Sequence, residues 1–343
     1  MPNNRILYAC QAVAIAKTGS NNTATPQFEV MKGVQSVGIN SNFTLEQLFE
    51  FGQIELYANV EDIAEVEVTI EKVIDGEKLL YLQAVGEIGK TNLVAASASV
   101  CDMYLAIYPD TTSSIVVGAS GTTPSRVVMC SGMSIGSVSY NYSVDDTAKE
   151  SITLLGNDKF WNAVTAGILN ATPTTLYGTG GSSALPINGS DVPVSGIVRR
   201  GKFNLAASTL PAEVLSQTNN ITGSYGIQSI AVSADFGREN QLELGRFGSY
   251  NKTANFPFEI TTQFEVTATN GDLVSVSGRG ENLTDRTIVI KDNAGTVLNM
   301  GTKNKLTSVS YQGGDTGGGN ATVSYSFSTF NDFKVDGGGT YWS

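Results

Sequence analysis

The sequence predicts a mainly β protein with two tandem antiparallel β-barrel or sandwich domains, each with a short flanking helix. Glycine makes up 37 of the 343 residues, above the usual share of about 7%. Ser, Thr, Asn, Val and Ile are also abundant, which suits short strands joined by tight turns. Two further observations support this class: apolar and polar residues alternate in several segments, and the chain contains a faint copy of itself.

The internal repeat is clearest between residues 33–43 and 226–236. Four identities share one offset: Gly33, Gln35, Ser36 and Phe43 recur as Gly226, Gln228, Ser229 and Phe236. The offset holds as far as Tyr57 and Tyr250, and residues 137–140 recur later as 308–311 at a smaller offset. Equal spacing of equal residue types predicts a duplicated folding unit, with an insertion in the first copy within 86–126.

The repeat divides the chain into a first domain over 1–161, a linker over 162–196 and a second domain over 197–343. The linker is rich in Gly, Ser, Thr and Pro, which favours loop structure over a packed core.

In the first unit we expect strands over 5–16 and 33–43. Over 66–71 apolar residues alternate with Glu67, Thr69 and Glu71, the period of a half-buried strand. Residues 77–85 have a helical composition. Residues 97–108 are apolar and end at Pro109, and the Ser/Thr/Gly-rich residues 110–125 are expected to form a hairpin tip or a mobile loop. Another strand is expected at 138–144, and 152–155 would close the unit.

The second unit repeats this order. Over 258–266 apolar residues alternate with Glu259, Thr261, Gln263 and Glu265. Residues 292–295 (Asp-Asn-Ala-Gly) predict a hairpin turn, and 308–311 and 323–327 predict strands.

The charge balance and the missing residue types exclude several functions. The formal net charge is −11 and there is no histidine. A grip on nucleic acid needs a basic surface, and the usual nucleophilic triads and His-ligated metals need histidine. Residues 86–91 end like a phosphate loop, but Ala84 occupies the position of its first glycine. We therefore expect no enzyme activity, no metal and no cofactor.

The segment 45–57 is unusually apolar for a connection. Its large side chains are Leu45, Leu48, Phe49, Phe51, Ile54, Leu56 and Tyr57. Two alternatives are open: the segment folds back onto its own core, or it forms an arm that buries these groups against a neighbouring subunit. We favour the arm.

Residues 33–39, 45–57 and 66–76 together resemble the tail tube proteins of tailed bacteriophages. The resemblance is clearest over 33–85 and reaches the second unit only through the repeat. It implies a virion protein, assembled in the bacterial cytoplasm, whose rings stack into a tube that conducts DNA. Its partners would be further copies of itself, with sheath, tail terminator, baseplate or tape-measure proteins. Neither specific DNA binding nor membrane contact is expected.

In that setting Glu67, Thr69, Glu71, Glu259, Thr261, Gln263 and Glu265 would face the lumen, and 44–60 would contact the next ring. Most members of the family have one domain, so the duplication leaves two arrangements open. One is a trimeric ring with pseudo-six-fold symmetry, and the other is a hexamer with the second unit outside. A secreted β-rich adhesin or carbohydrate-binding protein is the alternative function.

Overall fold

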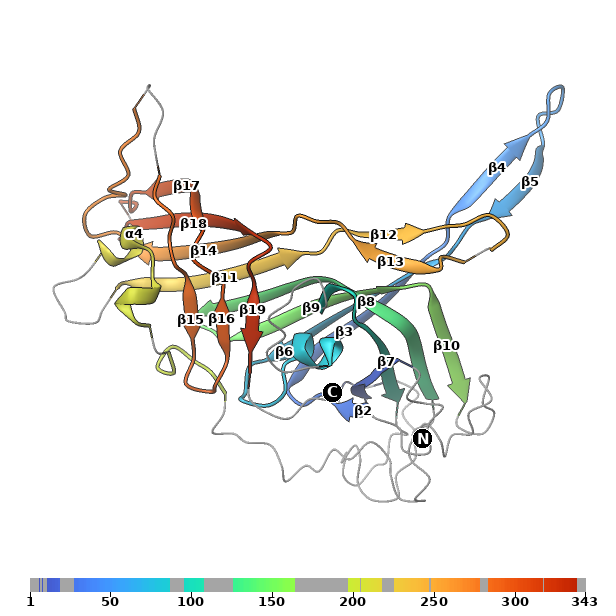
Figure 1. Cartoon of the computed structure of the whole chain (residues 1–343), viewed down its shortest axis with the longest axis horizontal. Helices are drawn as coiled ribbons and strands as arrows, with labels where there is room; N and C mark the ends of the chain where they lie inside the picture. Colours follow the sequence, from blue (N-terminus) through green and yellow to red (C-terminus); the bar gives the residue numbers. More distant parts are fainter. Residues whose placement is uncertain are drawn as a thin grey trace, which may run out of the picture.

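The computed structural model describes residues 6, 8, 11–18, 28–86, 96–107, 126–163, 197–203, 205–217, 225–246, 248–277, 283–316 and 318–337. Antiparallel strands dominate it and helices are few and short, which confirms the predicted mainly β class (Figure 1).

Besides the helical residues 96 and 97, the first unit contributes ten strands and the helix α1 of the described chain. They are β1 (Gln11–Lys17), β2 (Phe28–Val30), β3 (Val34–Asn42), β4 (Leu45–Phe49), β5 (Leu56–Glu61), β6 (Glu65–Val73), α1 (Leu80–Val85), β7 (Val100–Ile107), β8 (Arg126–Ser143), β9 (Lys149–Gly156) and β10 (Asp158–Ala163).

The second unit begins with a 3-10 turn and a short helix, and strands follow. They are η3 (Ala207–Thr209), α4 (Ala212–Leu215), β11 (Ile227–Asp235), β12 (Arg238–Gln241), β13 (Asn251–Ala254), β14 (Glu259–Thr267), β15 (Val289–Lys291), β16 (Val297–Asn299), β17 (Lys305–Gln312), β18 (Thr322–Phe330) and β19 (Lys334–Asp336).

One 12-stranded sheet contains strands of both units. Its main path runs β3-β6-β9-β8-β11-β14-β18-β17, so the two units are joined edge to edge where β8 pairs with β11. The long β8 also carries β10 on one side of its first half, and β7, β1 and β2 on the other. The buried apolar residues of both units form one contiguous core.

The two halves of the main path have matching irregularities. A bulge lies between Val34 and Ser36 in β3, and between Ile227 and Ser229 at the corresponding place in β11. The other edge of each half repeats this, with shifts between Ile135 and Ser137 in β8 and between Leu306 and Ser308 in β17. Bulges re-aim side chains at defined positions, so the segments that the sequence aligns occupy corresponding places in the two half-sheets.

The turns before β3 and β11 also correspond. Gly33 has a φ of 75° and Gly226 a φ of 65°, values that favour glycine. The side-chain amide of Gln35 donates a hydrogen bond to the Gly33 carbonyl at 3.2 Å. The side-chain amide of Gln228 donates to the Gly226 carbonyl at the same distance. The repeated Gly and Gln residues thus have a local structural purpose.

Some elements differ from expectation. The first strand begins at Gln11, and residues 6 and 8 lie outside it. Both units have a short helix, but α1 follows β6 whereas α4 precedes β11. In 268–277, where a copy of α1 would begin, the chain is not helical. The turn at 292–295 does join β15 to β16, and the Asp292 carboxylate accepts the backbone N–H groups of Ala294 and Thr296, each at 2.9 Å.

All of the segment 110–125 and most of the linker at 162–196 lie outside the described residues. The domain boundaries therefore stay predictions.

Candidate assembly surfaces

One face of the main sheet is polar across all eight strands. Opposite residues of antiparallel strands share a face, so the register traces a row across the sheet. This row is Ser36, Glu71, Ser151, Ser139, Ser233, Thr261, Ser328 and Lys305. We call this surface the polar face.

The seven residues expected to face a lumen all lie on the polar face. In β6, Glu67, Thr69 and Glu71 alternate with the buried Val66, Val68 and Ile70. In β14, the corresponding members are Glu259, Thr261, Gln263 and Glu265, which alternate with buried residues in the same way. The sequence therefore identified side chains that the fold brings onto one surface.

A hollow of about 490 Å³ lies on the polar face beside β8 and β9. It is lined by residues that include Glu71, Ser139 and Asn141. Lys149 forms ion pairs there with Glu71 at 3.5 Å and with Asp146 at 3.2 Å. Exposed ion pairs of this kind contribute little to stability. The hollow is therefore a solvated polar surface.

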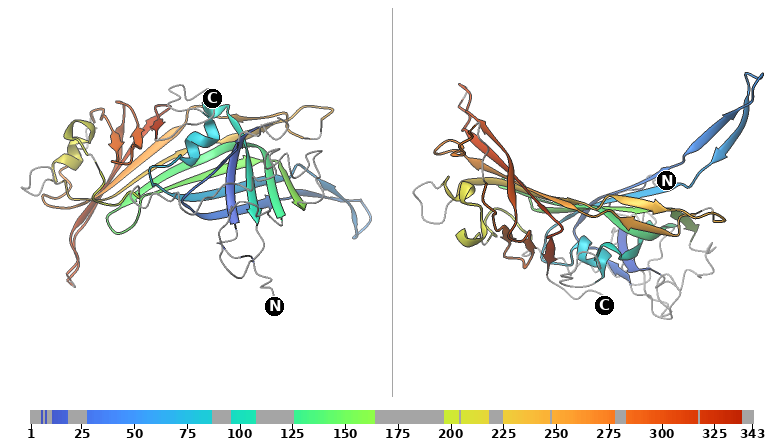
Figure 2. Two further views of the ribbon diagram at one scale, coloured as in Figure 1. Left: turned by 90° about the horizontal axis from the view of Figure 1, so that it is seen from below. Right: turned by 45° about the horizontal axis from the view of Figure 1, so that its top comes forward.

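The apolar segment 45–57 forms a projecting hairpin. β4 and β5 pair with each other and with no other described strand, and they extend well beyond the sheet in two views (Figures 1 and 2). The seven large side chains predicted here are all exposed, and Phe51 and Ile54 at the tip are fully so. We call this hairpin the first arm.

The alternative that the segment folds back onto its own core is wrong. Water around so many apolar groups is unfavourable, and the first arm leaves these groups uncovered within a single chain.

A shorter hairpin, β12–β13, leaves the second half-sheet at the same end of the molecule (Figure 1). We call it the second arm. It carries fewer apolar groups, with Leu242, Leu244 and Tyr250 exposed. Its base is held to the first unit, because the Arg238 side chain donates a hydrogen bond to the Ile135 carbonyl at 2.7 Å. Burial lowers the pKa of Arg238 to about 10.

The two ends of the main path, β3 and β17, are open edges in the described part of the chain. β3 pairs only with β6, and β17 only with β18. An open edge presents unpaired backbone N–H and C=O groups that can template another strand. Neither edge is short, since β3 has 9 residues and β17 has 8.

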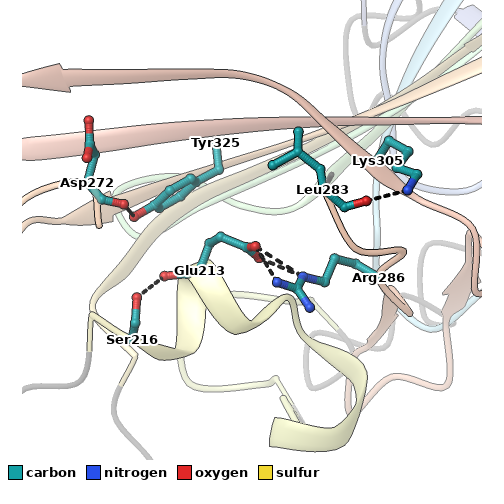
Figure 3. A network of polar contacts seen from close by, with 7 residues as sticks. All are labelled: Glu213, Ser216, Asp272, Leu283, Arg286, Lys305 and Tyr325. Carbon is teal, nitrogen blue, oxygen red and sulfur yellow. Dashed lines mark hydrogen bonds and ion pairs between the residues drawn. The ribbon is translucent and has the colours of Figure 1, made fainter. Parts of the chain in front are cut away.

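Polar contacts tie α4 and the segments before β15 to each other and to β17 and β18 (Figure 3). We call these covering segments the outer layer. The Arg286 guanidinium grips the Glu213 carboxylate of α4 with contacts of 2.6 and 3.0 Å. Tyr325 of β18 donates its hydroxyl to the Asp272 carbonyl at 2.9 Å, and Lys305 at the start of β17 bonds the Leu283 carbonyl. This layer supports β17 from one side and leaves its far edge open.

Sequence reasoning missed a buried carboxylate under α1. Glu150 of β9 accepts hydrogen bonds from the backbone N–H groups of Leu80 and Tyr81, and from the Tyr140 hydroxyl at 2.9 Å. Burial raises the pKa of Glu150, against the opposing effect of these donors and of Lys72. The available signal was its spacing, because Glu150 lies two positions from both Ala148 and Ile152, which are buried on the same face.

The described residues contain no group of three or more Cys, Asp or Glu placed to hold a metal ion. No helix in the described ranges has the length and apolar character to cross a membrane. The phosphate-loop-like segment 86–91 lies outside the described residues after Gly86.

Comparisons with known proteins give only distant structural similarity. No known family and no curated protein matches the sequence. Among solved structures, the chain is similar to the tube-terminating cap of the anti-feeding prophage, with 10% identity and a TM-score of 0.32 over 48% of this chain and 94% of that one. It is also similar to a chain of the PVC extracellular contractile injection system, solved as an extended sheath–tube complex. There the identity is 12% and the TM-score 0.32 over 47% of this chain and 94% of that one.

Proposed function

We propose that this chain is a structural subunit of a phage tail, which assembles into rings that stack into a tube for DNA ejection. The observation that carries the proposal is the junction between β8 and β11, where two half-sheets join edge to edge within one chain. The polar face is continuous across that junction, and both arms leave at one end of it.

The polar face would form the wall of the lumen. Its carboxylates include Glu67, Glu71, Glu259 and Glu265, and the chain as a whole has a formal net charge of −11. An anionic wall repels phosphates, so DNA would pass without adhering. No catalytic step is part of this function.

Each chain would supply two neighbouring positions of a ring with pseudo-six-fold symmetry, so three chains would complete it. The first arm would bury its apolar tip against the next ring. The hexamer with the second unit outside is disfavoured, because β11 and β14 of the second unit lie in the same sheet as β6 and β9 of the first.

Electron microscopy of the purified protein, combined with light scattering, tests the proposal. Rings or tubes with three-fold symmetry and a central channel are expected. A protein that stays monomeric at high concentration contradicts a tube subunit and leaves the adhesin alternative, which glycan binding would then test.

A further inference from the structure

The junction between the two units has an unbroken register. It extends from the Phe236 N–H, which donates to the Gly136 carbonyl at 2.9 Å, to the Val144 N–H, which donates to the Gln228 carbonyl at 3.0 Å. Between these two bonds β8 and β11 pair residue for residue without a bulge. The junction is therefore a complete example of how the last strand of one half-sheet meets the first strand of another.

The two open edges are the counterparts of the two strands in this junction. β3 is the first strand of the first half-sheet, as β11 is of the second. β17 is the last strand of the second half-sheet, as β8 is of the first. The bulges of β3 and β11 correspond, and so do those of β8 and β17. The edges of one chain thus match the two sides of a junction that the same chain already contains.

Exposure shows what the open edges lack. Phe236 at the end of β11 is 2% exposed, whereas its counterpart Phe43 beyond β3 is 74% exposed. Tyr140 of β8 is 1% exposed, whereas its counterpart Tyr311 of β17 is 51% exposed. A large aromatic ring left in water at both edges points to a covering strand and outer layer that another molecule must supply.

We propose that β17 of one copy pairs antiparallel with β3 of a second copy, in the register of the β8–β11 junction. The repeat offsets transfer that register to the open edges. Ser137–Asp235 becomes Ser308–Asn42, and Ser139–Ser233 becomes Ser310–Asn40. This inference rests on the proposed function, because it names the contact that closes the ring.

The in-chain junction also fixes which pairs exchange hydrogen bonds. In antiparallel ladders bonded and non-bonded pairs alternate. Phe236 and Gly136 are a bonded pair, so Ser233 and Ser139, three positions along, are a non-bonded pair. Cα atoms of such pairs are about 4.5 Å apart, within the range that a disulfide spans. Asn40 and Ser310 inherit this geometry, and both side chains are exposed on the polar face.

A double variant, Asn40→Cys with Ser310→Cys, tests the register by oxidation and non-reducing electrophoresis. The two positions lie on strands at opposite ends of the main path, so a disulfide between them has to join two chains. We expect the monomer band to shift to dimers and a closed covalent trimer. An equal mixture of the two single variants should stop at dimers, and either single variant alone should stay monomeric. Every variant also carries Cys10→Ser, because Cys10 lies outside the described residues, and the buried Cys101 and Cys130 are shielded from this reaction.

Two matched variants calibrate the result. Ser139→Cys with Ser233→Cys places the same pair within one chain, and should form an intramolecular disulfide under the same conditions. Asn40→Cys with Ser308→Cys keeps both side chains on the polar face, but slips the register by two residues. Diagonal neighbours are about 7–8 Å apart, so this variant should not cross-link.

Electron microscopy of the same samples separates the two proposals. Two outcomes overturn the register but leave the tube function standing. In the first, rings form and the slipped pair (Asn40→Cys with Ser308→Cys) cross-links. In the second, rings form and neither pair cross-links, although Ser139→Cys with Ser233→Cys forms its disulfide within the chain. Samples without rings or higher assemblies overturn both.

Discussion

Glu150 caps the start of α1, and its Oε2 atom lies 2.6 Å from the backbone nitrogen of Leu80. Helix termini leave their first N–H groups without intrahelical partners, and α1 has no capping side chain of its own. The cap therefore comes from a strand that is 70 residues away in sequence. Through this contact β9 positions α1 over the sheet, where Tyr81 stacks on Phe236 of the second unit at 6.4 Å between ring centroids.

We expect Glu150→Ala to lower the free energy of unfolding by about 3 kcal/mol, because it leaves buried backbone donors and the Tyr140 hydroxyl without an acceptor. Urea denaturation measures this. Glu61→Ala is the matched control: it removes an exposed carboxylate on the first arm and should change stability by less than about 0.5 kcal/mol. Equal stability of the two variants would show that Glu150 does not hold α1.

The same carboxylate should make stability depend on pH. Burial raises the pKa of Glu150 above 4.5, its ordinary value, so the folded state binds this proton more tightly than the unfolded state. The contribution is fully present below the ordinary pKa and is lost as pH rises through the raised value. The stability of the wild type relative to Glu150→Gln should therefore increase as pH falls from neutral. Denaturation of both proteins at fixed ionic strength checks the sign, and a constant difference would contradict it.

The first arm should control stacking and not folding. Phe51→Ser with Ile54→Ser removes the two fully exposed apolar groups at its tip, so we expect an unchanged melting temperature but rings that no longer form tubes. Electron microscopy counts the tubes. Val276→Ser changes an exposed apolar residue outside both arms and should leave tube formation intact. Tubes of normal length from the double variant would exclude the arm as the inter-ring contact.

The polar face should repel DNA through its charge. Glu67→Lys with Glu71→Lys reverses two carboxylates on that face, and we expect assembled tubes to retain DNA in a manner that weakens as salt rises. The control, Glu61→Lys with Asp62→Lys, makes the same change in net charge away from the polar face, at and just beyond the end of the first arm. Filter binding at several salt concentrations compares them. Equal DNA retention by both variants would show that net charge, and not the polar face, governs passage.

Blocking one edge should leave a folded protein that cannot close a ring. Val309 of β17 is the counterpart of Val138. In the in-chain junction Val138 pairs with Ala234, and by the alternation described above these two residues are a hydrogen-bonded pair. In the proposed pairing the Val309 N–H therefore points away from β18, a position where an edge strand tolerates proline. Val309→Pro should keep its circular dichroism spectrum and remain monomeric in light scattering. Val309→Thr, which keeps the N–H, should assemble, and assembly of the proline variant would rule out this edge.

Much of the sheet could be predicted from the sequence, because period-2 alternation is a local signal. The strands at 33–43 and 66–71 and the faces of Glu67 and Glu259 follow from it directly. The repeat at Gly33 and Gly226 could be recognised in the sequence because a turn with positive φ favours glycine. The apolar composition at 45–57 likewise indicated an arm, since turns seldom need large side chains.

The rest depends on contacts between distant segments. Nothing in the sequence of β8 alone shows that this strand of 18 residues pairs with strands of both units. Its pairing with β11 is set by the tertiary structure. The helix α4 has only 4 residues, too few to show a period, and α4 is placed by Arg286, which is 73 residues from Glu213. Glu150 looks like an ordinary strand residue until the start of α1 is set above it.

In the proposed ring, the β8–β11 junction would change how assembly responds to concentration. Within a chain that contact costs no loss of translational freedom, since its two sides are already tethered. A ring closed by three such chains needs fewer molecular encounters than one built from six single units, so its critical concentration is lower. Because the two repeats are in one chain, they do not have to be identical. The first and second arms can therefore differ, and they would alternate in a fixed order around the ring.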